Sequence, residues 1–304
     1  MKKVILILLG CFPIFCLAQI SVEYSDFNVT DDVLLIEEYT YKKVTLKEFN
    51  NADTEHKKKY EFKNGLLVKT ENKFNPGFGE KTLTSYYEHT KPFQEFTHFD
   101  IMGNGERFNM ATYTKQNFAG LEFYFPSTDI KVIKNIPNEE YTFNFSDKGG
   151  LSSGTHTIKR VDKNVQVTIP SFLGSSTIEF DSKKRPIKDL SSSKTIYTYG
   201  KDGLLIGTEQ FVGVGSYLDY YFYEKDKYGN WIKKIRTHKE DEIHFVARKL
   251  TYKNGETTGN TSYDFAFIKS FIDKMNAGDY AIAQEALEAA MSFTIIQKDK
   301  NTIQ

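Results

Sequence analysis

Aromatic residues recur along this chain at a spacing of two, and this spacing constrains the fold more than any other feature. Examples are Tyr39 and Tyr41, Tyr60 and Phe62, Phe123 and Phe125, Tyr197 and Tyr199, and Tyr221 and Tyr223. Because successive side chains of a β-strand point to opposite faces, residues two apart share one face. Aromatic residues make up 15% of the chain, so the pattern predicts a mainly β protein whose sheet faces are rich in aromatic rings.

Dipeptides typical of tight turns separate the aromatic runs. They are Asn64-Gly65, Asn104-Gly105, Asp202-Gly203, Gly229-Asn230 and Asn254-Gly255. Asn, Asp and Gly tolerate the positive φ angles that short hairpin turns require. Strands joined by such turns are antiparallel neighbours, so we expect antiparallel hairpin repeats that form one extended or curved sheet.

Several segments share a single plan, which consists of aromatic-x-aromatic, a polar turn with glycine, and then apolar residues alternating with Lys, Glu or Thr. They are YEFKNGLLVKTENKF (60–74), YTYGKDGLLIGTEQF (197–211), YFYEKDKYGNWIKKI (221–235) and LTYKNGETTGNT (250–261). A further segment, IEFDSKKRPIKDL (178–190), has Arg185-Pro186 in place of glycine. The only tryptophan, Trp231, follows the turn where the first two segments have leucine pairs. We therefore expect Trp231 to be a core-facing strand residue.

These units resemble the YD repeats of Rhs-type and related bacterial surface proteins, and more loosely the MORN-like repeats. The resemblance covers residues 57–75 and 177–261. The chain departs from the repeat at Lys63, Gly200 and Glu224, where an aspartate would follow the tyrosine. The resemblance implies hairpins that stack edge to edge in a continuous sheet. It implies no particular activity.

The first residues of the chain are typical of a secretory signal peptide. Lys2 and Lys3 precede an apolar stretch that runs to Leu17, and Cys16-Leu17-Ala18 places small residues where a signal peptidase reads the chain. Cleavage there would make Gln19 the mature N-terminus. Together with the Ala-Gln ending, which resembles signals of exported Bacteroidetes proteins, this predicts a location in the periplasm, on the outer surface or outside the cell.

Lipidation at Cys11 is the alternative for this segment, because Leu8-Leu9-Gly10-Cys11 resembles the box in which a cysteine is modified after cleavage. It would leave an apolar region of only about six residues, which is short for a signal peptide, so we prefer cleavage after Ala18. The mature chain would then have no cysteine, and therefore no disulfide or thiolate chemistry. We expect no membrane-spanning segment in it, because no later stretch is apolar enough.

The last forty residues have a different character. The segment from Asp264 to Phe293 has helix formers with apolar spacings of three and four, interrupted at Gly278-Asp279. We therefore expect a signal peptide over residues 1–18, an antiparallel β-hairpin repeat domain over 19–262, and a helical hairpin with a tail over 263–304. The helices weakly resemble half of a tetratricopeptide repeat, and we expect them to cap the sheet.

Motifs that could carry chemistry lack their supporting context. Gly150-Leu151-Ser152-Ser153-Gly154 fits the G-x-S-x-G formula, but strand-like sequence follows it where a nucleophile elbow needs a helix. The turn at 100–106 lacks the spaced acidic ligands of a calcium loop, and the six histidines show no metal-binding spacing. Forty basic residues balance forty acidic ones without long runs of either sign, which does not suggest a nucleic-acid partner. We predict no catalytic residue, no cofactor and no metal.

Functions of different classes stay open. We favour an exported non-catalytic β-repeat protein that acts in recognition or in envelope or surface structure, with a protein, glycan or lipid as its partner. The candidate contact residues are Trp231, Tyr221, Tyr223, Tyr197 and Tyr199. The alternative is a periplasmic carrier that binds a lipid or other apolar ligand in a curved sheet, with the C-terminal helices as a lid. A hydrolase with a dispersed carboxylate pair has no support in the sequence.

Overall fold

The computed structural model describes residues 27–276 except for position 31, position 106 and the segments 75–80, 102–104, 128–129, 146–153, 172–173, 192–193, 213–214 and 239–241. The strands are β1 (Val33–Tyr41), β2 (Val44–Thr45), β3 (Thr54–Lys63), β4 (Leu66–Phe74), β5 (Lys81–Lys91), β6 (Glu95–Ile101), β7 (Arg107–Phe118), β8 (Leu121–Pro126), β9 (Ile130–Ile136), β10 (Glu140–Phe145), β11 (Gly154–Val161), β12 (Asn164–Ser171), β13 (Gly174–Phe180), β14 (Pro186–Asp189), β15 (Thr195–Tyr199), β16 (Leu205–Val212), β17 (Gly215–Lys225), β18 (Trp231–His238), β19 (Glu242–Tyr252) and β20 (Thr257–Gly259). The helix is α1 (Phe265–Asn276). The predicted mainly β class, with a short C-terminal helical element, is confirmed.

The described strands form one large antiparallel sheet. From edge to edge, β9 to β19 follow in sequence order, then come β1 and β3, and then β4 to β8. The short strands β2 and β20 also pair with β19. The pairing of β1 with β19 joins the beginning of the described chain to its end, and it places Glu38 opposite Arg248.

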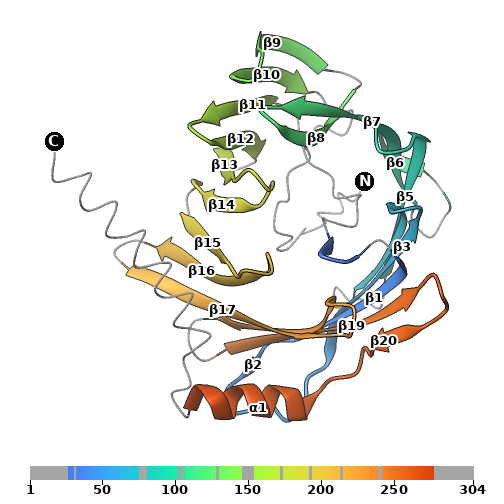
Figure 1. Ribbon diagram of the computed structural model, residues 1–304, viewed down its shortest axis with the longest axis vertical. Coiled ribbons are helices and arrows are strands. Elements are labelled where there is room, and N and C mark those ends of the chain that lie inside the picture. The colour runs from blue at the N-terminus through green and yellow to red at the C-terminus, as the bar shows by residue number, and fades with distance from the viewer. Residues whose placement is uncertain are drawn as a thin grey trace, which may run out of the picture.

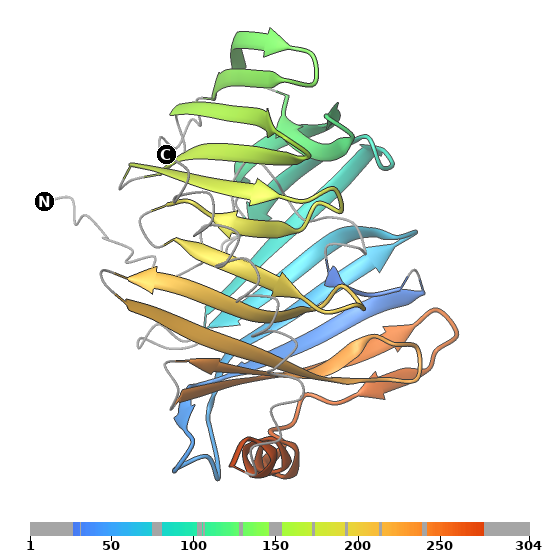
Figure 2. The ribbon, with the colours of Figure 1, turned by 60° about the vertical axis from the view of Figure 1, so that its left-hand side comes forward.

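The sheet curves round until its two ends meet, as Figures 1 and 2 show. Strand β8, at one end, is buried on both faces. Phe123 and Phe125 pack in a cluster with residues of β10 to β13, near the other end of the sheet. Tyr124, which lies between them in sequence, packs in a second cluster with residues of β6 and β7. Burial on both faces explains the almost continuous apolar run LEFYFP, since a strand solvated on one face would alternate.

Helix α1 covers the outer face of the sheet, away from the centre of the curve (Figure 1). Ile268 and Phe271 pack with Ile235 and Phe245 of β18 and β19. Asp264 caps the helix, because its Oδ1 accepts a hydrogen bond of 2.9 Å from the backbone N of Phe267. The first predicted helix is therefore present and packs on one face of the sheet. The second, expected after Gly278-Asp279, lies outside the described residues.

Four of the hairpin turns share one backbone geometry. They span residues 181–185, 200–204, 226–230 and 252–256, and in each the first residue's N donates to the fifth residue's O while its own O accepts from the fourth residue's N. The fourth residue has φ between 61° and 85° in all of them, and three of these residues are glycine. In this type of hairpin a loop of three residues joins the two strands, and the last loop residue, which is the fourth of each span, has a left-handed backbone conformation. Lys184 adopts the same φ in the segment without glycine, so the shared sequence plan produces a shared turn.

Candidate ligand-binding face

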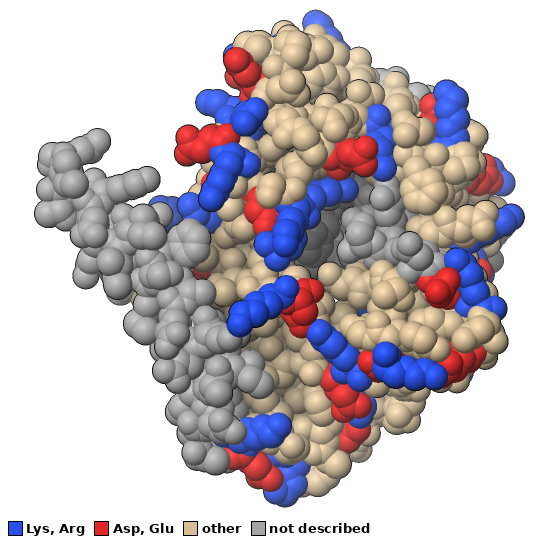
Figure 3. Space-filling model, viewed as in Figure 1, with Lys and Arg blue, Asp and Glu red and all other residues tan. Residues whose placement is uncertain are grey.

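Basic and acidic side chains are interspersed over the surface seen in Figure 3. The face of β15 to β19, β1 and β3 that lies opposite α1 carries aromatic and charged side chains. Because directly paired residues of antiparallel strands share a face, the register identifies them. Tyr223 pairs with Lys234, and Tyr221 pairs with Arg236. Glu38 lies between Arg248 and Lys58. We call this surface the inner face, and define it by Tyr197, Tyr199, Tyr221, Tyr223, Trp231, Lys234, Arg236, Arg248, Glu38 and Lys58.

The five aromatic residues predicted as contacts come together on the inner face. The four tyrosines extend from β15 and β17, and all of them are half-buried. Tyr199 and Tyr223 donate hydrogen bonds of 2.8 and 2.9 Å to the backbone O atoms of Pro186 and Leu205. Burial raises the pKa of Tyr197 to about 12, so its phenol is protonated at neutral pH. The surface therefore presents neutral rings with polar hydroxyl groups.

Trp231 is a buried residue and not an exposed stacking platform. Its side chain is 4% exposed and packs with Leu204, Val246 and Tyr223. The Cζ atom of Arg248 lies 3.4 Å from the centre of the indole ring, and the Nζ atom of Lys234 lies 4.9 Å from it. The expectation of a core-facing strand residue is confirmed. Its neighbours include cations as well as the expected aromatic rings, so the indole helps to hold the charged groups in place.

The acidic groups of the inner face are bound by arginines. Arg248 Nε donates a hydrogen bond of 2.8 Å to Glu38 Oε2, and both side chains are largely buried. Burial alone would raise the pKa of Glu38, but the charges of Arg248, Lys234 and Lys58 outweigh it and hold this pKa below its usual range. On the adjacent strands Arg236 binds Asp219 with Nε and Nη2, at 3.0 and 2.6 Å.

Lys234 stands out among these charges. Burial, aided by neighbouring cations, lowers the pKa of its ammonium group from 10.5 to about 8. Within the described part of the chain this ammonium group forms no ion pair or hydrogen bond, and it lies 4.9 Å from the centre of the Trp231 ring. No motif in the sequence pointed to Lys234, Arg248, Glu38 or Lys58 as ligand-binding residues. The run WIKKIRTH did contain a sequence signal for Lys234. Its two adjacent lysines must lie on opposite faces of the strand, so only one of them can lie on the outer surface of the sheet.

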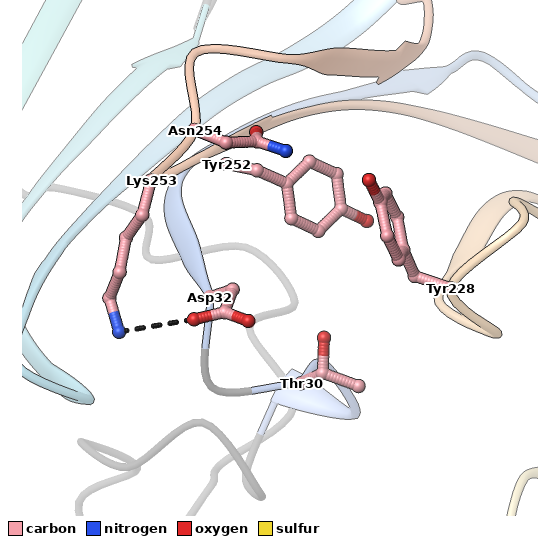
Figure 4. A pocket seen from close by; sticks show the side chains of 6 residues that line it. All are labelled: Thr30, Asp32, Tyr228, Tyr252, Lys253 and Asn254. Carbon is pink, nitrogen blue, oxygen red and sulfur yellow. Dashed lines mark hydrogen bonds and ion pairs between the residues drawn. The ribbon is translucent and has the colours of Figure 1, made fainter.

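A small pocket lies at the tip of the β17–β18 hairpin (Figure 4). Its volume is about 200 Å³, and its walls are Thr30, Asp32, Tyr228, Tyr252, Lys253 and Asn254. The groups around it are bonded to one another. Tyr228 donates a hydrogen bond to Glu256, and Lys253 pairs with Asp32 at 3.3 Å. Tyr252 donates to Asp226 and accepts from Asn230.

This network connects the hairpin to the segment that precedes β1. Asn230 Oδ1 accepts a hydrogen bond of 3.0 Å from the backbone N of Thr30. Asp226 also accepts a bond of 2.7 Å from Thr258. The polar groups around the pocket already have partners within the protein. The pocket is therefore part of a structural contact between the hairpin and the segment that precedes β1.

One buried cluster contains the residue types of a catalytic triad. Ser85 Oγ donates a hydrogen bond of 2.5 Å to Asp100 Oδ1, and His98 Nε2 lies 3.2 Å from the same oxygen. In a triad the imidazole lies between the serine and the carboxylate. Here the carboxylate lies in the middle, so His98 does not take the proton of Ser85. The predicted non-catalytic motif at Ser152 lies outside the described residues, although strands β10 and β11 flank it as expected.

Comparison with protein-family models gave no match, and comparison with curated proteins gave no significant similarity. Among the described residues no group of three or more His, Cys, Asp or Glu side chains could hold a metal ion. The helix of the described chain is too short to span a membrane.

Proposed function

We propose that this protein is an exported, non-catalytic recognition protein that binds a glycan on the inner face of its curved sheet. One observation carries the proposal, namely that four half-buried tyrosine rings from β15 and β17, the two strands on either side of β16, share one face with polar and charged groups. The face of an aromatic ring is partly negative, and it attracts the partly positive C–H groups of a sugar ring. The hydroxyl and charged groups beside the rings supply hydrogen bonds to sugar hydroxyls.

The alternative, a carrier for a lipid or another apolar ligand, has less support on this face. Glu38, Lys58, Lys234, Arg236 and Arg248 all belong to it. Covering ionised groups with hydrocarbon removes their hydration, which costs several kcal/mol per ion unless each is well paired. A polar ligand with a flat apolar side avoids this cost.

Arrayed glycans test the proposal with the mature chain that begins at Gln19. We expect binding to a subset of glycans, and we expect Tyr221→Ala to weaken it at least tenfold, which corresponds to about 1.4 kcal/mol for one lost ring contact. Tyr228→Ala is the matched control, because Tyr228 is 40% exposed, lies in the turn between β17 and β18, and is not one of the residues that define the inner face. Binding that survives Tyr221→Ala but is lost in Tyr228→Ala would place recognition elsewhere.

A further inference from the structure

Two lysines flank the buried Glu38–Arg248 pair on the inner face. Lys58 of β3 lies directly opposite Glu38 of β1, and Arg248 of β19 lies opposite Glu38 on its other side. Lys234 of β18 lies within 4.9 Å of the Trp231 ring on which Arg248 is stacked. The charges of all three cations act on the Glu38 carboxylate. One carboxylate therefore stands among three cationic groups.

The nearby acids cannot balance these charges. Glu38 is bonded to Arg248, and Asp219 is bonded to Arg236. Within the described residues the ammonium groups of Lys58 and Lys234 form no hydrogen bond or ion pair. A desolvated cation without a counterion is unfavourable. The ammonium group of Lys234 is partly removed from water, and this burial lowers its pKa.

We propose that Lys234 and Lys58 bind an oxyanion, so that the ligand of the inner face is an acidic sugar. This inference rests on the proposed glycan-binding function and specifies its ligand class. An incoming carboxylate or sulfate supplies the counterion that the protein does not provide. The pairing of Tyr223 with Lys234 on neighbouring strands places a ring beside a cation. A sugar ring on the tyrosines can thereby direct an acidic substituent to Lys234.

The single tryptophan makes the test specific. In ¹⁵N-labelled mature protein the indole N–H gives one resonance, and Lys234 lies 4.9 Å from that ring. We would titrate glucuronate, its neutral isostere glucuronamide, and glucose 6-sulfate at pH 7 and follow this resonance. The amide keeps the sugar ring and removes only the charge. The sulfate separates a general oxyanion site from one selective for carboxylates.

We expect glucuronate, glucose 6-sulfate or both to bind at least tenfold more tightly than glucuronamide. Lys234→Met should reduce the acid's affinity to that of the amide. Lys249→Met is the control, because Lys249 neighbours Arg248 in sequence but belongs to the other face of β19, where it pairs with Glu37 and is 42% exposed. The dispersion of the backbone amide resonances shows whether each variant is folded.

The outcomes separate this inference from the function on which it rests. If glucuronate and glucuronamide bind equally well, or if Lys234→Met leaves the preference for the acid unchanged, the oxyanion site is wrong and sugar binding stands. If none of the three sugars moves the indole resonance, both the oxyanion site and sugar binding at this face are overturned.

Discussion

Replacing Trp231 with alanine should destabilise this protein strongly. The indole is 4% exposed and packs with Leu204, Val246 and Tyr223. Truncation of a buried aromatic side chain to alanine costs about 3 to 5 kcal/mol. The truncation would also remove the cation–π contact with the Arg248 guanidinium, which lies 3.4 Å from the ring centre. A desolvated contact of this kind is worth about 2 kcal/mol. Because such contributions overlap, we expect a loss of about 5 kcal/mol in the free energy of unfolding.

The loss should be measured by urea unfolding followed by far-ultraviolet circular dichroism, since the variant has no tryptophan fluorescence. A domain of ordinary stability has about 5 to 15 kcal/mol in total, so Trp231→Ala should bring the protein close to unfolding. Trp231→Phe keeps a ring below Arg248 and should cost about half as much. Tyr228→Ala, at an exposed hairpin tip, should cost about 1 kcal/mol or less.

A loss below about 1 kcal/mol for Trp231→Ala would show that the indole is not a packed residue of the sheet. The native protein offers an independent check, because its fluorescence comes from this one side chain. We expect a blue-shifted emission that iodide quenches poorly. Emission at the wavelength of a water-exposed indole would contradict the packing described above.

The pKa of Lys234 is about 8 in the folded protein, below the ordinary 10.5. Between pH 8 and pH 10.5 the unfolded chain therefore binds more protons than the folded one, and the free energy of unfolding should rise with pH over this range. Lys234→Met should abolish this rise and stabilise the protein at pH 7, as urea unfolding at several pH values would show. Tyr252→Phe should cost about 1 to 3 kcal/mol, because it removes the hydroxyl that joins Asp226 to the buried Asn230, whereas Tyr228→Phe should stay within about 0.5 kcal/mol. Protein recovered from the native envelope should begin at Gln19, and a lipid-modified form beginning at Cys11 in its mass spectrum would contradict this.

Local physics made much of the fold readable from the sequence. The spacing of two identified strand faces, and the glycine-containing turns identified antiparallel neighbours, because both depend only on residues close together in the chain. The sequence plan shared by the hairpin segments placed Trp231 just after a turn and predicted that it faces a core. It also placed Tyr197 and Tyr199, and Tyr221 and Tyr223, on common faces of their strands, which the register then joined into one surface.

The tertiary structure alone decided which face became the inner one and which charges meet there. Alternation shows that two residues share a face, but it does not say whether that face turns toward the centre or toward a helix. Arg248 meets Glu38 only because β19 pairs with β1, and no local pattern encodes a pairing between strands at opposite ends of the chain. Lys233 and Lys234 are adjacent and identical in sequence. Alternation along β18 points the two side chains to opposite faces. The tertiary structure places Lys233 among the acids beside α1 and Lys234 on a face whose acids are already bound to arginines, so the same side chain becomes an ion pair on one face and a candidate ligand site on the other.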